Sequence, residues 1–149
     1  MKLSYQGILE KKQWQEAQIA LPGFDWRAMC LATLDTPTWV HFGAGNIFRG
    51  FIAALQQRLL EDGLEKTGII AAETFDDQII DRIYQPHDSM TLLATLRPDG
   101  SLERQVIASI AQGLKAKPEN AGDWRALCDL FAKPSLQMVS FTITEKGYA

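Results

Sequence analysis

The chain has 149 residues, of which 46% are hydrophobic and 22% charged, and its formal net charge is −3. This length suits one domain with its own core and is short for two. The small negative charge gives no reason to expect nucleic acid or a membrane as a partner. No apolar run reaches the roughly 18 residues of a membrane-spanning helix, and no signal peptide is recognisable, so we expect a cytoplasmic protein.

The cysteines and histidines form no pattern typical of a metal site. Cys30 and Cys128 lie far apart among apolar residues, which predicts two buried free thiols. His41 and His87 stand alone, without the paired spacing of metal ligands. We therefore expect no metal.

Residues 1–36 predict an N-terminal extension that packs against the domain. Residues 8–20 have the composition of a helix. Residues 24–34 predict a second, short helix with Asp25 as its N-cap. Neither segment carries recognisable chemistry.

Strands and helices alternate from Thr38 onward. Residues 38–42 and 67–73 predict two short buried strands, and residues 76–84 an amphipathic helix. The segment between the two strands predicts a helix that Gly63 ends. Its expected apolar stripe is Phe48, Phe51, Ile52, Leu55 and Leu59, with Arg49, Gln56, Gln57, Arg58 and Glu61 facing elsewhere. This order indicates a βαβ unit and a parallel sheet.

The C-terminal half predicts a hairpin, a helix and a strand. Residues 90–96 and 101–110 alternate apolar and polar positions around the turn pair Asp99-Gly100, and Met90, Leu92, Ala94 and Leu96 share one face. Residues 118–131 predict a helix whose stripe is Trp124, Leu127, Cys128 and Phe131, and residues 135–144 predict a last strand. The predicted fold class is α/β: a Rossmann-like, doubly wound, mostly parallel sheet with an inserted β-hairpin.

The segment HFGAGNIFRGF, residues 41–51, carries the chemistry. In a Rossmann first turn, GxGxxG provides a tight turn, an approach for the pyrophosphate and close helix packing. Gly43 and Gly45 suit the first two roles, whereas Phe48 occupies the third position and the next glycine is Gly50. A strand before the loop and a helix after it are what dinucleotide binding requires. The absence of Gly-Lys-Ser/Thr excludes a Walker A loop.

Several side chains near the glycines are candidates for cofactor binding. Arg49 is either a solvated helix residue or a cation beside a phosphate, and Asn46 could adopt a left-handed backbone or donate to a ligand. His41 is expected to be a packed residue at the strand end rather than a catalyst. The candidate residues of the loop are Gly43, Ala44, Gly45, Asn46, Ile47, Phe48 and Arg49.

The fingerprint also calls for an acidic residue at the end of the second strand, about 20 residues further on. Glu73 lies 23 residues after Gly50, and Thr74 follows it. Either Glu73 faces the ribose or it simply begins the next loop. In the first case its charge would repel a 2′-phosphate and favour NAD over NADP.

HFGAGNIFRGF and the later FTITEKGY together resemble the mannitol dehydrogenase family of polyol and hexuronate oxidoreductases. The family's loop reads GxGN or GxGxF followed by xR, which Gly43, Gly45, Asn46 and Arg49 match, and a non-glycine at Phe48 is tolerated there. The resemblance spans about residues 37–148 and leaves residues 1–36 uncovered. Members often carry aspartate where this chain has Thr74, which leaves the choice between NAD and NADP open.

The resemblance implies that residues 37–149 are an NAD(P)-binding Rossmann domain, incomplete relative to the full family fold. Such a domain would serve an NAD(P)-dependent oxidoreductase that transfers hydride between nicotinamide and a sugar alcohol, hexuronate or related keto-sugar. The family's catalytic lysine and the substrate site lie in a later, helical domain. We therefore expect no catalytic residue in this chain, no turnover by the chain alone, and NAD as cofactor with NADP as the alternative.

Thr144, Glu145 and Lys146 follow the last predicted strand, whose carboxyl end should line the nucleotide crevice. They are candidates to border the nicotinamide, or they form a hydrogen-bonded loop. The resemblance argues against Lys146 as the catalytic base.

Two other functional hypotheses remain. The chain could be a stand-alone nucleotide-binding sensor or interaction module without catalysis, or an α/β domain whose glycines only make a turn. A sensor should bind nucleotide more tightly than about 10 μM, whereas half of a cofactor crevice should bind it weakly.

Overall fold

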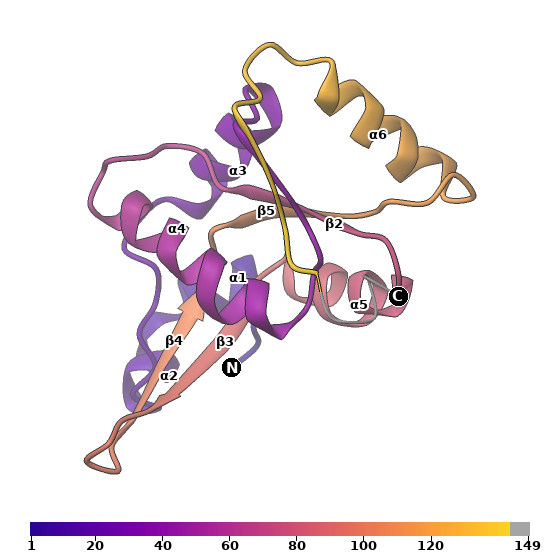
Figure 1. Ribbon diagram of the computed structural model, residues 1–149. Helices are drawn as coiled ribbons and strands as arrows, with labels where there is room; N and C mark the ends of the chain where they lie inside the picture. The colour runs from indigo at the N-terminus through magenta and orange to yellow at the C-terminus, as the bar shows by residue number, and fades with distance from the viewer. Residues whose placement is uncertain (144–149) are drawn as a thin grey trace.

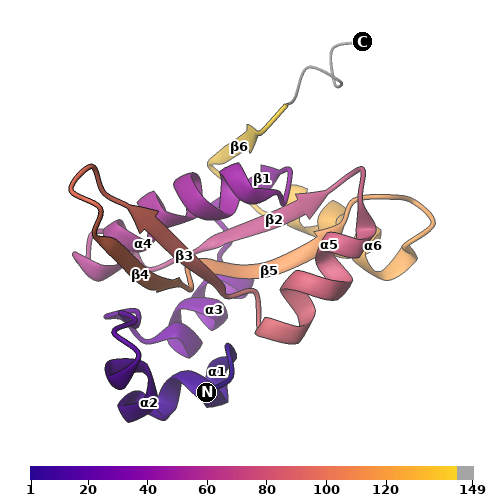
Figure 2. The same ribbon diagram turned by 90° about the horizontal axis from the view of Figure 1, so that it is seen from below.

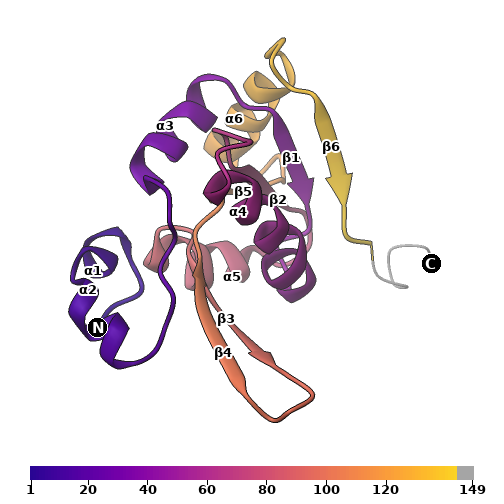
Figure 3. The same ribbon diagram turned by 90° about the vertical axis from the view of Figure 1, so that its left-hand side faces the viewer.

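The computed structural model describes residues 1–143. A four-stranded parallel sheet of order β5-β2-β1-β6 forms its centre, and the antiparallel hairpin β3-β4 extends away from it (Figures 1 and 3). The strand bounds are β1 Trp39–Phe42, β2 Ile69–Glu73, β3 Thr91–Leu96, β4 Leu102–Ile107, β5 Ile110–Lys115 and β6 Met138–Phe141. The α/β fold class with an inserted hairpin is thus confirmed.

Helices cover both faces of the parallel sheet. Their bounds are α1 Tyr5–Leu9, α2 Lys11–Glu16, α3 Trp26–Asp35, η1 Phe48–Ile52, α4 Ala53–Glu61, α5 Asp77–Ile79, η2 Ile80–Tyr84, η3 Gln85–His87 and α6 Ala121–Phe131. In Figure 1, α6 lies on one side of β2 and β5, and α4 and α5 lie on the other. Alternate β2 residues follow this division, since Ala71 packs with η1, α4 and η2, whereas Ile70 packs with α6.

The N-terminal segment packs on the hairpin, where Ile8 and Trp14 share a core with Val106 (Figure 2). The single helix predicted over residues 8–20 is wrong, because Glu10 leaves the helical conformation and separates α1 from α2. The break allows both Ile8 and Trp14 to reach the hairpin. Asp25 caps α3 as predicted, accepting a hydrogen bond from Ala28 N (3.0 Å). No helix among residues 1–143 is long and apolar enough to cross a membrane.

The apolar stripe predicted for residues 48–61 holds at Phe48 but is wrong at Phe51, Leu55 and Leu59. The buried positions after Phe48 are Ala53, Gln56, Gln57 and Leu60, whereas Phe51, Leu55 and Leu59 are exposed. The reason is η1, a π-helical stretch, which adds one residue to the turn and so rotates later positions by about 100°. The buried amides are paired: Gln57 donates to Val106 O (2.9 Å) and accepts from Ala108 N (2.7 Å), and Gln56 donates to Thr67 O (2.6 Å). Gly63 ends the helix with φ +68°, as predicted.

The sequence predicts one hairpin strand over residues 101–110, but the structure has two strands there, β4 and the start of β5. Residues 102–107 pair with β3, and Ile110 begins β5, which runs parallel beside β2. No glycine, proline, asparagine or aspartate marks the change of sheet at Ala108-Ser109. Leu92, Ala94 and Leu96 share an exposed face in residues 1–143, whereas Met90, predicted on the same face, is buried just before β3. Leu93 on the opposite face packs toward the core.

The predicted stripe of α6 is also wrong, because only Leu127 of its four residues is buried, together with Leu130. Asp123 takes an inward position in the first turn, where its carboxylate accepts a hydrogen bond from Lys115 N at the end of β5 (2.9 Å). This contact turns Trp124 and Cys128 outward. Cys128 is therefore exposed, contrary to expectation, whereas Cys30 is a buried free thiol whose pKa burial raises to about 12.

Candidate functional site

A glycine turn leaves the carboxyl end of β1 at the centre of the sheet. Gly43 has φ +108°, a conformation that L side chains rarely adopt, and a Cβ there would lie 3.1 Å from Thr142 O. The N–H of Gly43 donates a hydrogen bond to Ala72 O, near the carboxyl end of β2 (2.9 Å). Gly43 is therefore required by its own backbone and by the approach of the segment after β6.

Gly45 differs from Gly43 because its surroundings are open. A Cβ at Gly45 would meet no heavy atom of the described chain within 4 Å. The helix begins at Asn46, and its first backbone hydrogen bond runs from Arg49 N to Gly45 O (3.1 Å). The N–H groups of residues 45–48 precede that bond and have no helical carbonyl to pair with, which makes this end suited to an anion.

Arg49 is held at the start of this helix rather than extended into solvent. Its Nη2 donates to Asn46 Oδ1 at 2.5 Å, and its Nη1 lies 3.5 Å from Thr91 Oγ1. Its Nε is buried and has no hydrogen-bond partner in the described part of the chain. The loop thus combines open backbone N–H groups with a fixed guanidinium, a combination suited to a phosphate.

Phe48 fills the position where the fingerprint places its third glycine. The side chain is fully buried and its ring stacks on His41, with centroids 4.3 Å apart and planes 6° apart. The helix therefore packs on the sheet through an aromatic pair instead of a close backbone approach. His41 is confirmed as a packed residue of the strand.

His41 also belongs to a polar chain that joins β1 to β6. Trp39 Nε1 donates to Ser140 Oγ (2.7 Å), which lies 2.8 Å from His41 Nδ1, and His41 Nε2 lies 2.7 Å from Thr142 Oγ1. Ser140 Oγ accepts from Trp39, which favours the tautomer in which its hydroxyl proton is donated to His41 Nδ1 and Nε2–H donates to Thr142. Burial lowers the pKa of His41 to about 4, so the ring is neutral at pH 7.

Glu73 is buried at the end of β2, and its carboxylate binds backbone. One oxygen accepts from Ala44 N in the glycine loop (2.8 Å), and the other accepts from Phe75 N (2.8 Å) and Asp76 N (3.2 Å). The side chain thus ties the loop after β1 to the loop after β2. A ribose hydroxyl at this position would share the carboxylate with three backbone donors.

Ala44 has a second anchor that the sequence did not reveal. Tyr84 OH donates to Ala44 O (3.1 Å) from the far end of η2, and burial raises the pKa of this phenol. Gly113 of β5 allows this placement, because a Cβ there would lie 2.7 Å from the Tyr84 ring. Two other predicted positions are exposed: Ile47, after β1, and Thr74, directly after β2. Thr144, Glu145 and Lys146 lie outside the described residues.

A parallel α/β sheet with a glycine turn and a helix N-terminus at the carboxyl end of β1 defines a Rossmann-type dinucleotide-binding domain. No family model matches the chain. It is 45% identical over 148 residues to D-mannonate oxidoreductase of Thermotoga maritima, covering 99% of this chain and 27% of that protein. It is 31% identical to D-arabinitol 4-dehydrogenase of Klebsiella pneumoniae, covering 74% of this chain and 24% of that one.

A solved structure agrees with these relatives. Mannitol 2-dehydrogenase of Pseudomonas fluorescens, in a ternary complex with NAD and D-mannitol, matches with a TM-score of 0.74 and 26% identity over 99% of this chain and 28% of its own. The comparisons confirm that the chain is similar to the mannitol dehydrogenase family, and it spans about a quarter of the length of these relatives.

Proposed function

We propose that this chain is the cofactor-binding part of an NAD(P)-dependent oxidoreductase that acts on a sugar alcohol, hexuronate or related keto-sugar. The observation that carries the proposal is the turn from Gly43 to Arg49, where a guanidinium lies beside the first N–H groups of a helix, which precede its first helical hydrogen bond, at the carboxyl edge of the sheet. Relatives named for D-mannonate, D-arabinitol and mannitol support the substrate class, and the neighbour solved with NAD supports the cofactor.

The residues present fit a dinucleotide. The N–H groups of residues 45–48 would hold the pyrophosphate, the open side of Gly45 would admit it, and Arg49 would add a positive charge. Glu73 and Tyr84 hold Ala44 and so keep the turn in its binding shape. Thr74, which follows Glu73 at the end of β2, would border the adenosine ribose, and we retain Thr144, Glu145 and Lys146 as candidates for the nicotinamide side.

When bound, the nicotinamide supplies the hydride donor or acceptor. We assign no general acid or base to this chain, so the proton of the substrate hydroxyl would be moved by residues elsewhere in the enzyme. The 149-residue chain alone should therefore bind cofactor without turnover. We also propose a cytoplasmic location and no nucleic-acid or membrane partner, in keeping with the net charge of −3.

Titration of the chain with NADH, followed by nicotinamide fluorescence, tests this function. We expect saturable binding weaker than about 10 μM, because a chain that spans about a quarter of its relatives' length would hold only part of the crevice. Tighter binding would favour the stand-alone sensor. A folded protein that does not bind NADH at millimolar concentration would contradict the proposal and leave the glycines as turn residues only.

Gly45→Ala is expected to weaken NADH binding at least about tenfold, because the new methyl group occupies the side that the pyrophosphate would approach. Its free energy of unfolding should change by less than about 0.5 kcal/mol, since a Cβ meets no protein atom there. Gly122→Ala is the matched control, because a Cβ at Gly122 on α6 also meets nothing within 4 Å. Equal NADH dissociation constants for the two variants would remove Gly45 from the binding site.

A further inference from the structure

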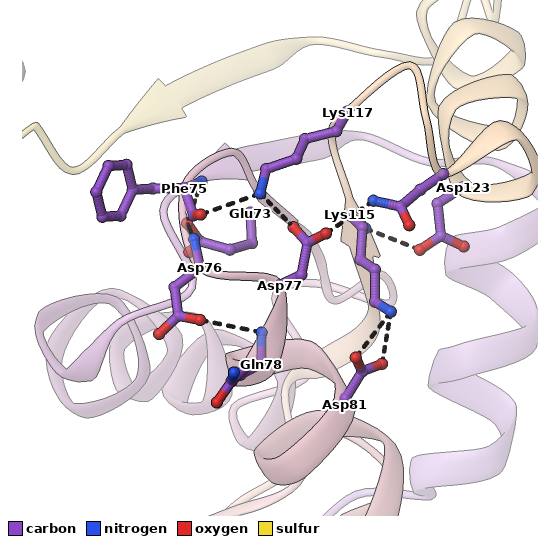
Figure 4. Close-up of polar contacts among 10 residues, drawn as sticks. Glu73, Phe75, Asp76, Asp77, Gln78, Asp81, Lys115, Lys117 and Asp123 are labelled. Atoms are coloured by element: carbon purple, nitrogen blue, oxygen red, sulfur yellow. Dashed lines mark hydrogen bonds and ion pairs between the residues drawn. The ribbon is translucent and has the colours of Figure 1, made fainter.

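A network of charged side chains occupies the edge of the sheet where β2 and β5 end (Figure 4). Lys117, two residues after β5, donates from Nζ to Phe75 O in the loop after β2 (3.0 Å). The same Nζ lies 2.9 Å from Asp77 Oδ1, and that oxygen is buried. Asn120 donates to the other oxygen of Asp77 (2.9 Å), so the carboxylate is fixed from two sides.

The second lysine of this edge has its own partner. Lys115 Nζ lies 2.6 Å and 2.9 Å from the two carboxylate oxygens of Asp81, and its backbone N–H binds Asp123. Asp76 caps α5 through Gln78 N. Lys115 is therefore paired with Asp81 and Lys117 with Asp77, and Glu73, Asp76 and Asp123 add further acidic side chains near this edge.

This edge is where the adenosine ribose of a dinucleotide lies in a Rossmann-type domain, next to the residues that follow the second strand. Binding of a 2′-phosphate there needs a free cation, whereas binding of the ribose diol of NAD does not. Lys117 has the position for such a cation, since it contacts the carbonyl two residues after Glu73, but it is committed to Asp77. The hydrogen bond from Lys117 holds the pKa of Asp77 below its usual range, so the aspartate stays charged at neutral pH.

We propose that Asp77 is a specificity-determining residue of this cofactor site: by neutralising Lys117 at the ribose edge, it makes the site accept NAD and disfavour NADP. This inference rests on the proposed function. Asp77 acts through Lys117 and need not touch the cofactor, so it is a positioning residue. Loss of its charge should release Lys117 toward a 2′-phosphate.

The test compares dissociation constants for NADH and NADPH, measured by fluorescence titration of the 149-residue chain and its variants. The wild-type protein should prefer NADH. Asp77→Asn should tighten NADPH binding about tenfold and change NADH binding less than about threefold, because a freed ammonium adds one charge-assisted contact to the phosphate. Asp77→Asn combined with Lys117→Met should lose that gain.

The controls separate the possible outcomes. Asp99→Asn in the hairpin turn makes the same change of net charge far from the edge, and it should leave both constants unchanged. The inference is overturned if the gain in NADPH affinity persists in the double variant that lacks Lys117. It is also overturned if folded Asp77→Asn shows no gain in NADPH affinity. If Asp77→Asn does not fold, Asp77→Ser tests the same loss of charge. A wild-type chain that binds neither nucleotide contradicts the proposed function itself, whereas one that binds NADH and is insensitive to Asp77 contradicts only this inference.

Discussion

Glu73→Gln is expected to lower the free energy of unfolding by about 2–4 kcal/mol. The substitution keeps the size of the side chain but replaces one carboxylate oxygen with an amide NH2 group, which then faces backbone N–H donors. In the native protein the two oxygens accept from Ala44 N, Phe75 N and Asp76 N at 2.8–3.2 Å. Hydrogen bonds to a charged acceptor are worth about 1.5–3 kcal/mol, and a buried donor left unpaired adds to the loss.

Urea unfolding followed by tryptophan fluorescence measures this change. Glu65→Gln is the matched control, because Glu65 is exposed, and it should shift the free energy of unfolding by less than about 0.5 kcal/mol. Nucleotide binding by Glu73→Gln distinguishes two roles. A residue that only bound ribose would lose NADH affinity with little loss of stability, whereas one that fixes the glycine loop loses both together.

The strands that form the site could be predicted from short apolar runs bounded by turn residues. β1 and β2 lie within the predicted ranges 38–42 and 67–73, and the glycine turn follows β1 as the loop pattern indicated. β5 could not be predicted in this way, because Ala111, Gln112 and Gly113 carry neither β-branched side chains nor an alternating pattern. Its place beside β2 is set by tertiary packing of Gly113 against Tyr84.

Helix faces were less predictable than helix positions. The π-helical turn at Phe48–Ile52 changes the face of every later residue, and nothing in the sequence of the turn signals the extra residue. The wrong stripe looked more plausible because it placed leucines inside and glutamines outside. Backbone groups at Thr67, Val106 and Ala108 need partners within the fold, and Gln56 and Gln57 supply them.

The residues of the candidate site also divide into those that a local sequence pattern indicates and those that depend on tertiary contacts. Gly43, Gly45 and Arg49 could be found from local spacing, since a turn and a helix N-terminus are local structures. Glu73 could be found as a candidate, but its contact with Ala44 N joins residues 29 positions apart and depends on sheet order. The pairing of Asp77 with Lys117 spans a still greater separation and has no local signal at all.

His41 shows how tightly the glycine turn is coupled to β6. Its ring stacks on Phe48 on one side and bonds the hydroxyl groups of Ser140 and Thr142 at its edges. Thr142 O is in turn the atom nearest to a Cβ at Gly43. Protonation of His41 would give both ring nitrogens a proton, so Ser140 Oγ would have to accept from Trp39 and from the ring together.

The pH dependence of stability should therefore report on His41. Its pKa falls from 6.5 in the unfolded chain to about 4 in the folded protein, so between these values the unfolded state binds more protons. The stabilisation from a neutral His41 is complete above pH 6.5 and is lost as the pH falls toward 4, by about 3 kcal/mol in all.

His41→Gln cannot titrate in this range, so its urea unfolding curves at pH 7, 5.5 and 4 should lose less stability than those of the wild-type protein. Carboxylates contribute similarly to both proteins, and the difference between them isolates the histidine. Parallel loss in the two proteins would show that His41 accepts a proton in the folded state, and the neutral link from Trp39 to Thr142 would then be wrong.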